Sequence, residues 1–295
     1  EGSFSMNIPK IIHQIWVGTK PFPEKDLAWC ESIKRTNPYW KFVLHAEHPD
    51  NMPKDGPWDA IQSVPDLILG YLVDALRDRM SPKRFPAGFA DIVRLEVLIR
   101  EGGVYFDTDV VGVKPIDDIM ENLTLGLAWE YSQHQIGNFF IGSIPGHPAL
   151  VSTLNEIHST TRGAISCCHD LNPFWITGPK VIEKVLPEYP DCTIFPFSVM
   201  SPWNPTLPFP TDFEKIPFSP ATRVVHLFDS KWTHLPRDPN IPLEEGLAVH
   251  WHDEHCRDEE GRWCPEPDGH WTWPCHENNE PGEVKNPPTD YDYFE

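Results

Sequence analysis

The sequence lacks three features that would each define a class of protein. No run approaches the roughly 18 to 20 consecutive apolar residues of a membrane-spanning helix. Seven cysteines, an odd number, do not describe a paired disulfide framework. Basic residues are scarce, because 24 Lys and Arg stand against 44 Asp and Glu, for a net charge of -20. This balance argues against a surface for nucleic acid or anionic lipid, which needs clustered Lys and Arg.

Apolar and aromatic residues are present in the amounts of a folded protein. They make up 40% and 12% of 295 residues, enough for one large domain, alone or with an appendage. The leading EGSFS, residues 1–5, is interpreted as a cloning remnant before a start at Met6. On that interpretation the chain is a complete soluble protein, and we expect it in the cytoplasm. A secretory location would follow only if the sequence is a piece of a longer protein.

Hydrophobic patterns predict alternating strands and helices, the arrangement of an α/β domain with ligand chemistry at its strand ends. The predicted strands cover residues 11–17, 41–46, 104–113, 125–129 and 138–142. The predicted helices cover residues 26–35, 66–79, 89–100, 149–158 and 181–185, and Gly102-Gly103 ends the third of them. After about residue 255 the chain is acidic and rich in Trp and Pro, without periodicity.

Two carboxylates mark the predicted strand 104–113. A strand places residues i and i+2 on one face, so Asp107 and Asp109 should project together while Thr108 points away. Paired carboxylates suit hard divalent cations such as Mg²⁺ or Mn²⁺, which prefer oxygen ligands. The alternative is a solvated turn, because the pattern Asp-x-Asp is frequent by chance.

The helix before this strand carries a further charged pair. Asp91 and Arg94 lie three residues apart and therefore project from one helical face. The alternative is a surface ion pair, which contributes less than about 1 kcal/mol. A helix that carries such a pair directly into a Gly-Gly turn and an acidic strand is less common, and this favours a functional site.

The block FADIVRLEVLIREGGVYFDTDV resembles the signature of the family 32 glycosyltransferases, which share a sugar-binding region with a DXD motif. It is also similar to the catalytic core of the clostridial glucosylating toxins. IPKIIHQIWVG, NFFIGSIPGHP, ITGP and HLFDSKW resemble further segments of the family, in the family's order. The resemblance implies a GT-A-type nucleotide-sugar-binding fold. Because the composition changes after about residue 255, we expect the catalytic domain at residues 6–255 and an irregular, partly flexible appendage at residues 256–295.

Several site residues follow from this resemblance alone. Asp91, Arg94, Asp107 and Asp109 match the catalytic positions, with Asp109 as direct metal ligand and Asp107 facing donor and metal. The donor-binding positions are matched by Trp16, Tyr105, Asp107, Asn138, Ser230 and Trp232. The alternative for Trp16 and Tyr105 is a place in the core, and Asn138 could instead support a loop.

The remaining histidines and cysteines leave alternatives open. The resemblance favours His226 as the side chain that completes the metal site, and His250 is the alternative. His13 and His45 carry no companions and are expected to be core or surface residues. A zinc site would draw on Cys256, Cys264 and Cys275 with nearby histidines, but the close C-x2-C spacing of such sites is missing.

The resemblance implies a metal-dependent, retaining glycosyltransferase with Mn²⁺ or Mg²⁺ as cofactor. It would move a hexose from a nucleotide-sugar to a hydroxyl of a glycan, lipid or protein. A UDP-linked donor is slightly favoured over a GDP-linked one. A metal-dependent phosphohydrolase is a second interpretation, and it predicts more carboxylates at strand ends. A carbohydrate-binding protein with a transferase-like core is a third.

Overall fold

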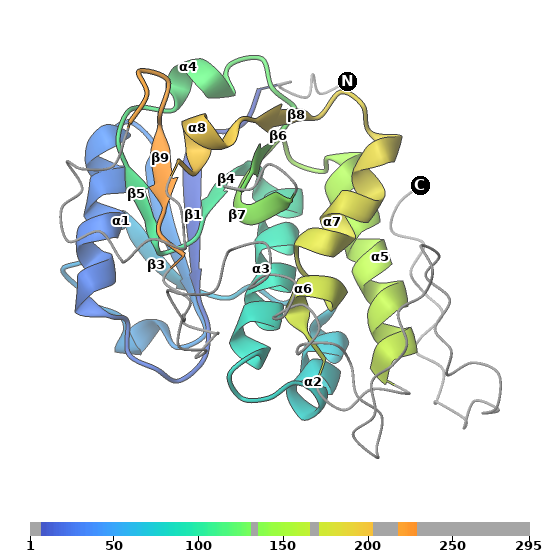
Figure 1. Ribbon diagram of the computed structural model, residues 1–295. Helices are drawn as coiled ribbons and strands as arrows, with labels where there is room; N and C mark the ends of the chain where they lie inside the picture. Colours follow the sequence, from blue (N-terminus) through green and yellow to red (C-terminus); the bar gives the residue numbers. More distant parts are fainter. Residues whose placement is uncertain (1–6, 131–134, 166–170, 203–217, 229–295) are drawn as a thin grey trace, which may run out of the picture.

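A computed structural model of the chain describes residues 7–130, 135–165, 171–202 and 218–228 (Figure 1). Seven strands form one mixed sheet in the order β3-β2-β1-β4-β7-β6-β8. β1, β2, β3 and β4 run parallel, and β7 is antiparallel to both β4 and β6. These strands are β1 (Ile11–Trp16), β2 (Lys41–Ala46), β3 (Ala60–Ser63), β4 (Gly103–Phe106), β6 (Leu125–Trp129), β7 (Ile136–Ser143) and β8 (Thr193–Phe195). The predicted α/β class is confirmed, and β3 and β8 were not predicted.

Helices cover both faces of the sheet (Figure 1). The larger core cluster joins one face to α2 (Gly70–Arg79), α3 (Phe85–Glu101), α5 (Pro148–Ile165), α6 (Pro173–Ile176) and α7 (Pro179–Val185). The other core cluster joins the opposite face to α1 (Glu24–Thr36), α4 (Asp117–Met120) and α8 (Phe197–Met200). Two short 3-10 helices, η1 (Pro49–Asn51) and η2 (Leu186–Glu188), are also present. Each predicted helix is present, and α3 and α5 are longer than their predicted ranges.

Two glycines set the geometry between α3 and β4. Gly102 and Gly103 have φ angles of 65° and 98°, in the region that side chains other than glycine rarely adopt. A Cβ atom on Gly103 would also lie 2.5 Å from the carbonyl oxygen of Ile11 on β1. The chain therefore turns sharply from the buried helix into the middle of the sheet, as the Gly-Gly pair predicted.

The single strand predicted at 104–113 is wrong, because two strands in different sheets occupy that range. β4 lies in the large sheet and ends at Phe106. β5 (Val110–Gly112) pairs with β9 (Val224–His226) in a separate two-stranded sheet. Between them the chain makes a turn in which the Val110 N–H donates to the Asp107 carbonyl at 3.3 Å. The acidic triplet therefore lies in a tight connection, and not within a strand.

His13 and His45 are fully buried, and the expectation that they carry no companions is wrong. His13 Nε2 lies 2.9 Å from the Gly102 carbonyl and must carry a proton to donate to it. His13 Nδ1 then accepts from His45 Nε2 at 3.0 Å, and His45 Nδ1 accepts from Gln62 Nε2 at 3.2 Å. Burial lowers the pKa of His13 to about 4 and that of His45 to about 3, so both rings are neutral. They form a structural chain of hydrogen bonds from β3 to the Gly-Gly turn.

Candidate active site

Three potential metal ligands converge where β4, β5 and β9 meet. Asp107, Asp109 and His226 offer ligand atoms that all lie within 4.8 Å of one another. His226 Nε2 is 3.6 Å from Asp109 Oδ1 and 3.9 Å from Asp107 Oδ2. The β5–β9 pairing sets Val110 opposite His226 and so carries the imidazole to the acidic triplet from far along the chain.

The acidic triplet is held by its central residue. Thr108 is buried, and its hydroxyl donates to Asp26 Oδ2 on α1 at 3.4 Å. With the middle side chain anchored against α1, the two flanking carboxylates point toward the opposite side, where His226 lies. The sequence-based expectation that Asp107 and Asp109 project together is therefore correct, but a turn produces it, and not the alternation of a strand. The alternative of a solvated turn is correct in that the triplet forms a turn, and wrong in that the central residue of this turn is buried against α1.

Two aromatic rings fix the imidazole of His226. Its ring stacks on Phe139 at a centroid distance of 4.4 Å and an angle of 12°, and Phe228 lies 4.0 Å away on a tilted plane. Burial alone would lower the pKa of His226, but the facing Asp109 and Asp107 carboxylates raise it above its ordinary value. A ring held this way presents Nε2 to the carboxylates, and a cation bound there would replace its proton.

The three side chains fit a divalent cation. Two carboxylate oxygens and one imidazole nitrogen form a donor set that suits Mn²⁺ and related ions. Asp107 and Asp109 keep part of their surface exposed, so the position between them is reachable. Asp107, Asp109 and His226 would hold the ion, and His250 lies outside the described residues.

Asp91 and Arg94 form a buried pair, so the alternative of a surface ion pair is wrong. Each is 5% exposed, and Arg94 Nη2 lies 3.0 Å from Asp91 Oδ1. The Asn138 side-chain amide donates to Asp91 Oδ1 at 2.7 Å, and the Thr177 hydroxyl donates to Asp91 Oδ2 at 2.8 Å. Burial raises the pKa of Asp91 to about 6, an effect that Arg94 opposes.

Arg94 links this buried cluster to the acidic triplet. Its Nη1 lies 3.4 Å from Asp107 Oδ1 and donates to the Asn138 carbonyl at 2.5 Å. Its guanidinium carbon lies 4.5 Å from the centroid of the Tyr105 ring, and the Tyr105 hydroxyl donates to Asp107 Oδ1 at 2.5 Å. Although burial alone would lower the pKa of Arg94, the surrounding acidic groups raise it above its ordinary value. A permanent positive charge therefore lies beside the potential metal ligands.

Trp16 is the last residue of β1, the strand that pairs with β4. It is 8% exposed, packs on Phe22 at 4.9 Å between ring centroids, and donates from Nε1 to the Lys20 carbonyl at 2.9 Å. These are the contacts of the core alternative, and stacking on a base stays a prediction. Ser230, Trp232, the cysteines of the suggested zinc site and the whole of 256–295 lie outside the described residues.

Two residues of the site were missed by the sequence-based predictions. Thr177 belongs to the ITGP segment, which was noted only as a turn, and it donates to Asp91. Phe139 follows Asn138 on β7. It was not predicted as a site residue, because an aromatic residue in a strand is usually assigned to the hydrophobic core. Its contact with His226 depends on β9 and carries no local sequence signal.

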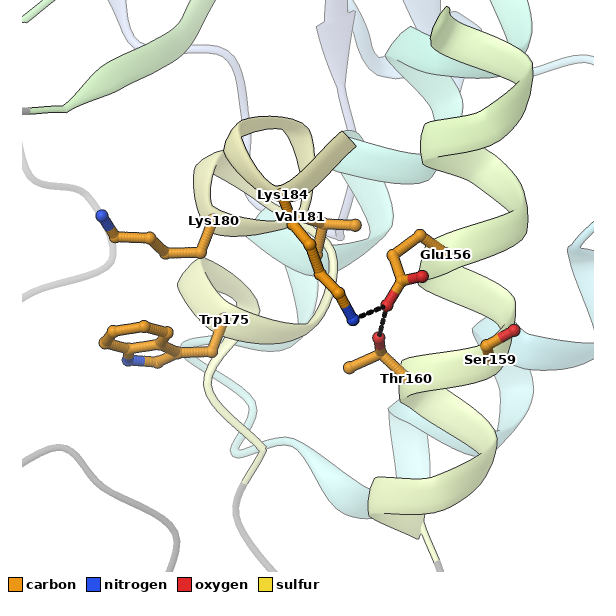
Figure 2. Close-up of a pocket in the computed structure, with 7 residues that line it drawn as sticks. All are labelled: Glu156, Ser159, Thr160, Trp175, Lys180, Val181 and Lys184. Carbon is orange, nitrogen blue, oxygen red and sulfur yellow. Dashed lines mark hydrogen bonds and ion pairs between the residues drawn. The ribbon is translucent and has the colours of Figure 1, made fainter. Parts of the chain in front are cut away.

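A separate hollow of about 170 Å³ lies between α5, α6 and α7 (Figure 2). Trp175 and Lys180 are on one side of it, and Lys184 pairs with Glu156 at 2.6 Å on the other (Figure 2). Trp175 precedes Thr177 by two residues, so α6 connects the hollow to the Asp91 cluster. Glu156, Ser159, Thr160, Trp175, Lys180, Val181 and Lys184 line it.

A family model for the glycosyltransferase sugar-binding region containing a DXD motif matches residues 23–125. These residues include α1, α3 and the acidic triplet. No helix in the described part of the chain has the length and apolar character needed to cross a membrane.

Curated relatives match about half of the chain. The initiation-specific alpha-1,6-mannosyltransferase of Candida albicans is 28% identical over 182 residues, 53% of this chain and 44% of that protein. Inositol phosphoceramide mannosyltransferase 3 of Schizosaccharomyces pombe is 29% identical over 159 residues, 52% of this chain and 38% of that protein. The chain therefore spans less than half the length of these relatives.

The solved PaToxG glycosyltransferase structure is 23% identical with a TM-score of 0.51, covering 62% of this chain and 70% of that one. Its likeness supports the predicted GT-A-type fold.

Proposed function

We propose that the chain transfers a hexose from a nucleoside-diphosphate sugar to a hydroxyl acceptor, because its residues 23–125 match the model of the glycosyltransferase sugar-binding region containing a DXD motif. The proposal includes a bound Mn²⁺ or Mg²⁺ and the site residues Asp91, Arg94, Asp107, Asp109 and His226.

The observation that carries this proposal is the permanently charged guanidinium of Arg94, which lies beside three potential metal ligands. Arg94 lies 3.4 Å from Asp107, which also belongs to the group Asp107, Asp109 and His226. Breaking the bond between sugar and diphosphate leaves negative charge on the diphosphate. A divalent ion supplies Lewis-acid stabilisation there, and a preorganised guanidinium adds to it.

The other side chains of the cluster suit the donor sugar. Carboxylate and amide groups of Asp91 and Asn138 hydrogen-bond each other and have the polarity to bind sugar hydroxyls. Tyr105 orients Asp107 through its hydroxyl. Trp16, Ser230 and Trp232 stay proposals from the family resemblance, as contacts to the base and the donor.

The finer features rest on resemblance. Retention of anomeric configuration is what the resemblance to family 32 implies, and a slight preference for UDP over GDP is proposed beside it. Both relatives named above are mannosyltransferases, which favours a GDP-linked mannose as one donor to test. The acceptor class, whether glycan, lipid or protein, and a cytoplasmic location are proposals of the same kind.

A phosphohydrolase is disfavoured by the composition of the site. In the described part of the chain, Asp107, Asp109 and His226 are the one group of three potential metal ligands within 4.8 Å. A two-metal hydrolase would need additional carboxylates around a second ion.

The test is a panel of UDP- and GDP-linked hexoses incubated with Mn²⁺ and scored for released nucleoside diphosphate. We expect release from one donor, dependent on Mn²⁺ and lost on chelation. Cleavage of p-nitrophenyl phosphate without cleavage of any nucleotide-sugar would contradict the proposal and support the phosphohydrolase.

A further inference from the structure

Glu130 is a partly buried carboxylate at the same edge of the sheet as the acidic triplet. It follows the last residue of β6, and its backbone N–H donates to the Gln135 carbonyl at 2.9 Å. Its Oε2 accepts from the Gln135 side-chain amide at 3.1 Å. Within the described part of the chain, no basic residue forms an ion pair with it. One amide hydrogen bond leaves most of the carboxylate's accepting capacity unused.

The path of the Glu130 side chain is set by Gly137 on β7. A Cβ atom on Gly137 would lie 2.7 Å from Glu130 Cγ and 2.5 Å from Phe139 Cδ1. Glu130 therefore lies directly against the strand backbone, next to the Phe139 ring, which a side chain at 137 would prevent.

This places Glu130 on the metal-ligand side of β7. Gly137 and Phe139 share one face of the strand, and Phe139 stacks on His226. Asn138 points to the opposite face, where it bonds Asp91. Neighbouring residues of β7 therefore contact both parts of the site, Asn138 the Asp91 cluster and Phe139 the ring of His226.

Charged groups on the metal-ligand side and on α7 both act on the Glu130 carboxylate. Burial raises its pKa to about 7, and His226 opposes this effect from the metal-ligand side. Asp107 raises the pKa further from that side, while Glu183 and Lys180 act from α7. Glu130 is therefore close enough to both the acidic triplet and α7 for the charges of both to act on it.

We infer that Glu130 accepts a hydrogen bond from the hydroxyl that attacks the donor sugar, and so orients the acceptor. The inference rests on the proposed function. A carboxylate repels the leaving diphosphate but binds a hydroxyl donor well, so an acceptor suits this position better than the phosphates do. Asp91, Asn138 and Arg94 are the groups proposed above to bind the donor, which leaves Glu130 for the nucleophile.

The test is Glu130→Gln, with water as the smallest hydroxyl acceptor. The Gln135 amide would hold the new side-chain oxygen, so the new NH₂ group would turn to the site and could no longer accept the hydroxyl's hydrogen bond. Using the donor found with the panel and Mn²⁺, we expect kcat for donor hydrolysis to fall at least about tenfold, the effect of one hydrogen bond to a charged group. The dissociation constant of the matching nucleoside diphosphate with Mn²⁺ should change less than about twofold.

The matched control is Glu156→Gln, which removes a carboxylate paired with Lys184 and should change neither quantity. An unchanged kcat in Glu130→Gln would overturn the inference, and so would a parallel loss of nucleotide affinity, which would make Glu130 a support of the metal site. If the native protein neither binds UDP or GDP with Mn²⁺ nor cleaves any donor, the proposed function fails, and the inference fails with it.

Discussion

Asp107 and Asp109 have different surroundings although they are two residues apart. Asp107 accepts from the Tyr105 hydroxyl and lies 3.4 Å from Arg94, so part of its charge is compensated by the protein. Asp109 faces His226 Nε2 at 3.6 Å. The approach of Asp109 to His226 agrees with the proposed role of Asp109 as the direct metal ligand.

Asp109→Asn should therefore abolish donor cleavage without unfolding the protein. The amide keeps the shape of the side chain but loses the anionic ligand, and we expect nucleoside-diphosphate release with Mn²⁺ to fall at least about 100-fold. The melting temperature without metal should change little, because the change removes both the repulsion between Asp107 and Asp109 and the attraction between Asp109 and His226. Release assays and thermal melts of purified protein measure both.

Asp118→Asn is the control for this change. Asp118 is an exposed carboxylate that pairs with Arg223 at 2.6 Å, away from the acidic triplet. It should keep native activity. Native-level activity in Asp109→Asn itself would remove Asp109 from the metal site.

At the scale of secondary structure, buried hydrogen bonds connect the elements that carry the site. The chain Gln62–His45–His13–Gly102 joins β3, β2, β1 and the turn that leads into β4. Both rings must stay neutral, because a proton on His45 Nδ1 would face the Gln62 amide donor.

This arrangement predicts a pH-dependent stability. The folded pKa values, about 4 for His13 and about 3 for His45, lie below the unfolded value near 6.5. The unfolded state therefore binds more protons below pH 6.5, and stability falls as the pH is lowered toward about 4. His45→Gln removes one of these groups, so its stability relative to the native protein should rise by about 2 kcal/mol between pH 7.5 and pH 5.

Urea unfolding at the two pH values measures this difference. The exchange His48→Gln serves as control, because His48 is exposed and lies outside the sheet. If the difference in unfolding free energy between the native protein and His45→Gln does not change with pH, the buried histidines have no part in the acid sensitivity.

The sequence predicted the elements with strong local patterns and failed where distant segments meet. The helix at 89–100 was predicted because its apolar spacing and its Gly-Gly end are local signals, and α3 confirms it. The strand at 104–113 was predicted as continuous because apolar residues flank the acidic triplet on both sides. Only pairing with β9, more than a hundred residues later, separates β5 from β4.

The site residues follow the same division. Asp91 and Arg94 were correctly predicted to lie together, because residues three positions apart on a helix project from the same face. The companions of His13 and the stack of Phe139 on His226 depend on tertiary packing, and the approach of Glu130 to Gly137 depends on the pairing of β6 with β7. None of these contacts has a periodic signal in the sequence.

At the scale of the whole molecule, a net charge of -20 has to coexist with the proposed binding of an anionic diphosphate. The fold offers a local solution, because Arg94 and three potential cation ligands lie together where β4 leaves the sheet. Without a bound cation, Asp107, Asp109 and Glu130 would repel the diphosphate. Nucleotide binding should therefore depend on the metal.

The most direct measurement is a thermal melt with UDP or GDP, in the presence and absence of Mn²⁺. At a nucleotide concentration about 100 times the dissociation constant, binding stabilises the folded state by about 2.7 kcal/mol, which raises the melting temperature by several degrees. We predict this rise with Mn²⁺ and its loss when Mn²⁺ is chelated. A melting temperature that neither nucleotide changes in the presence of Mn²⁺ would contradict a metal-dependent nucleotide-sugar site.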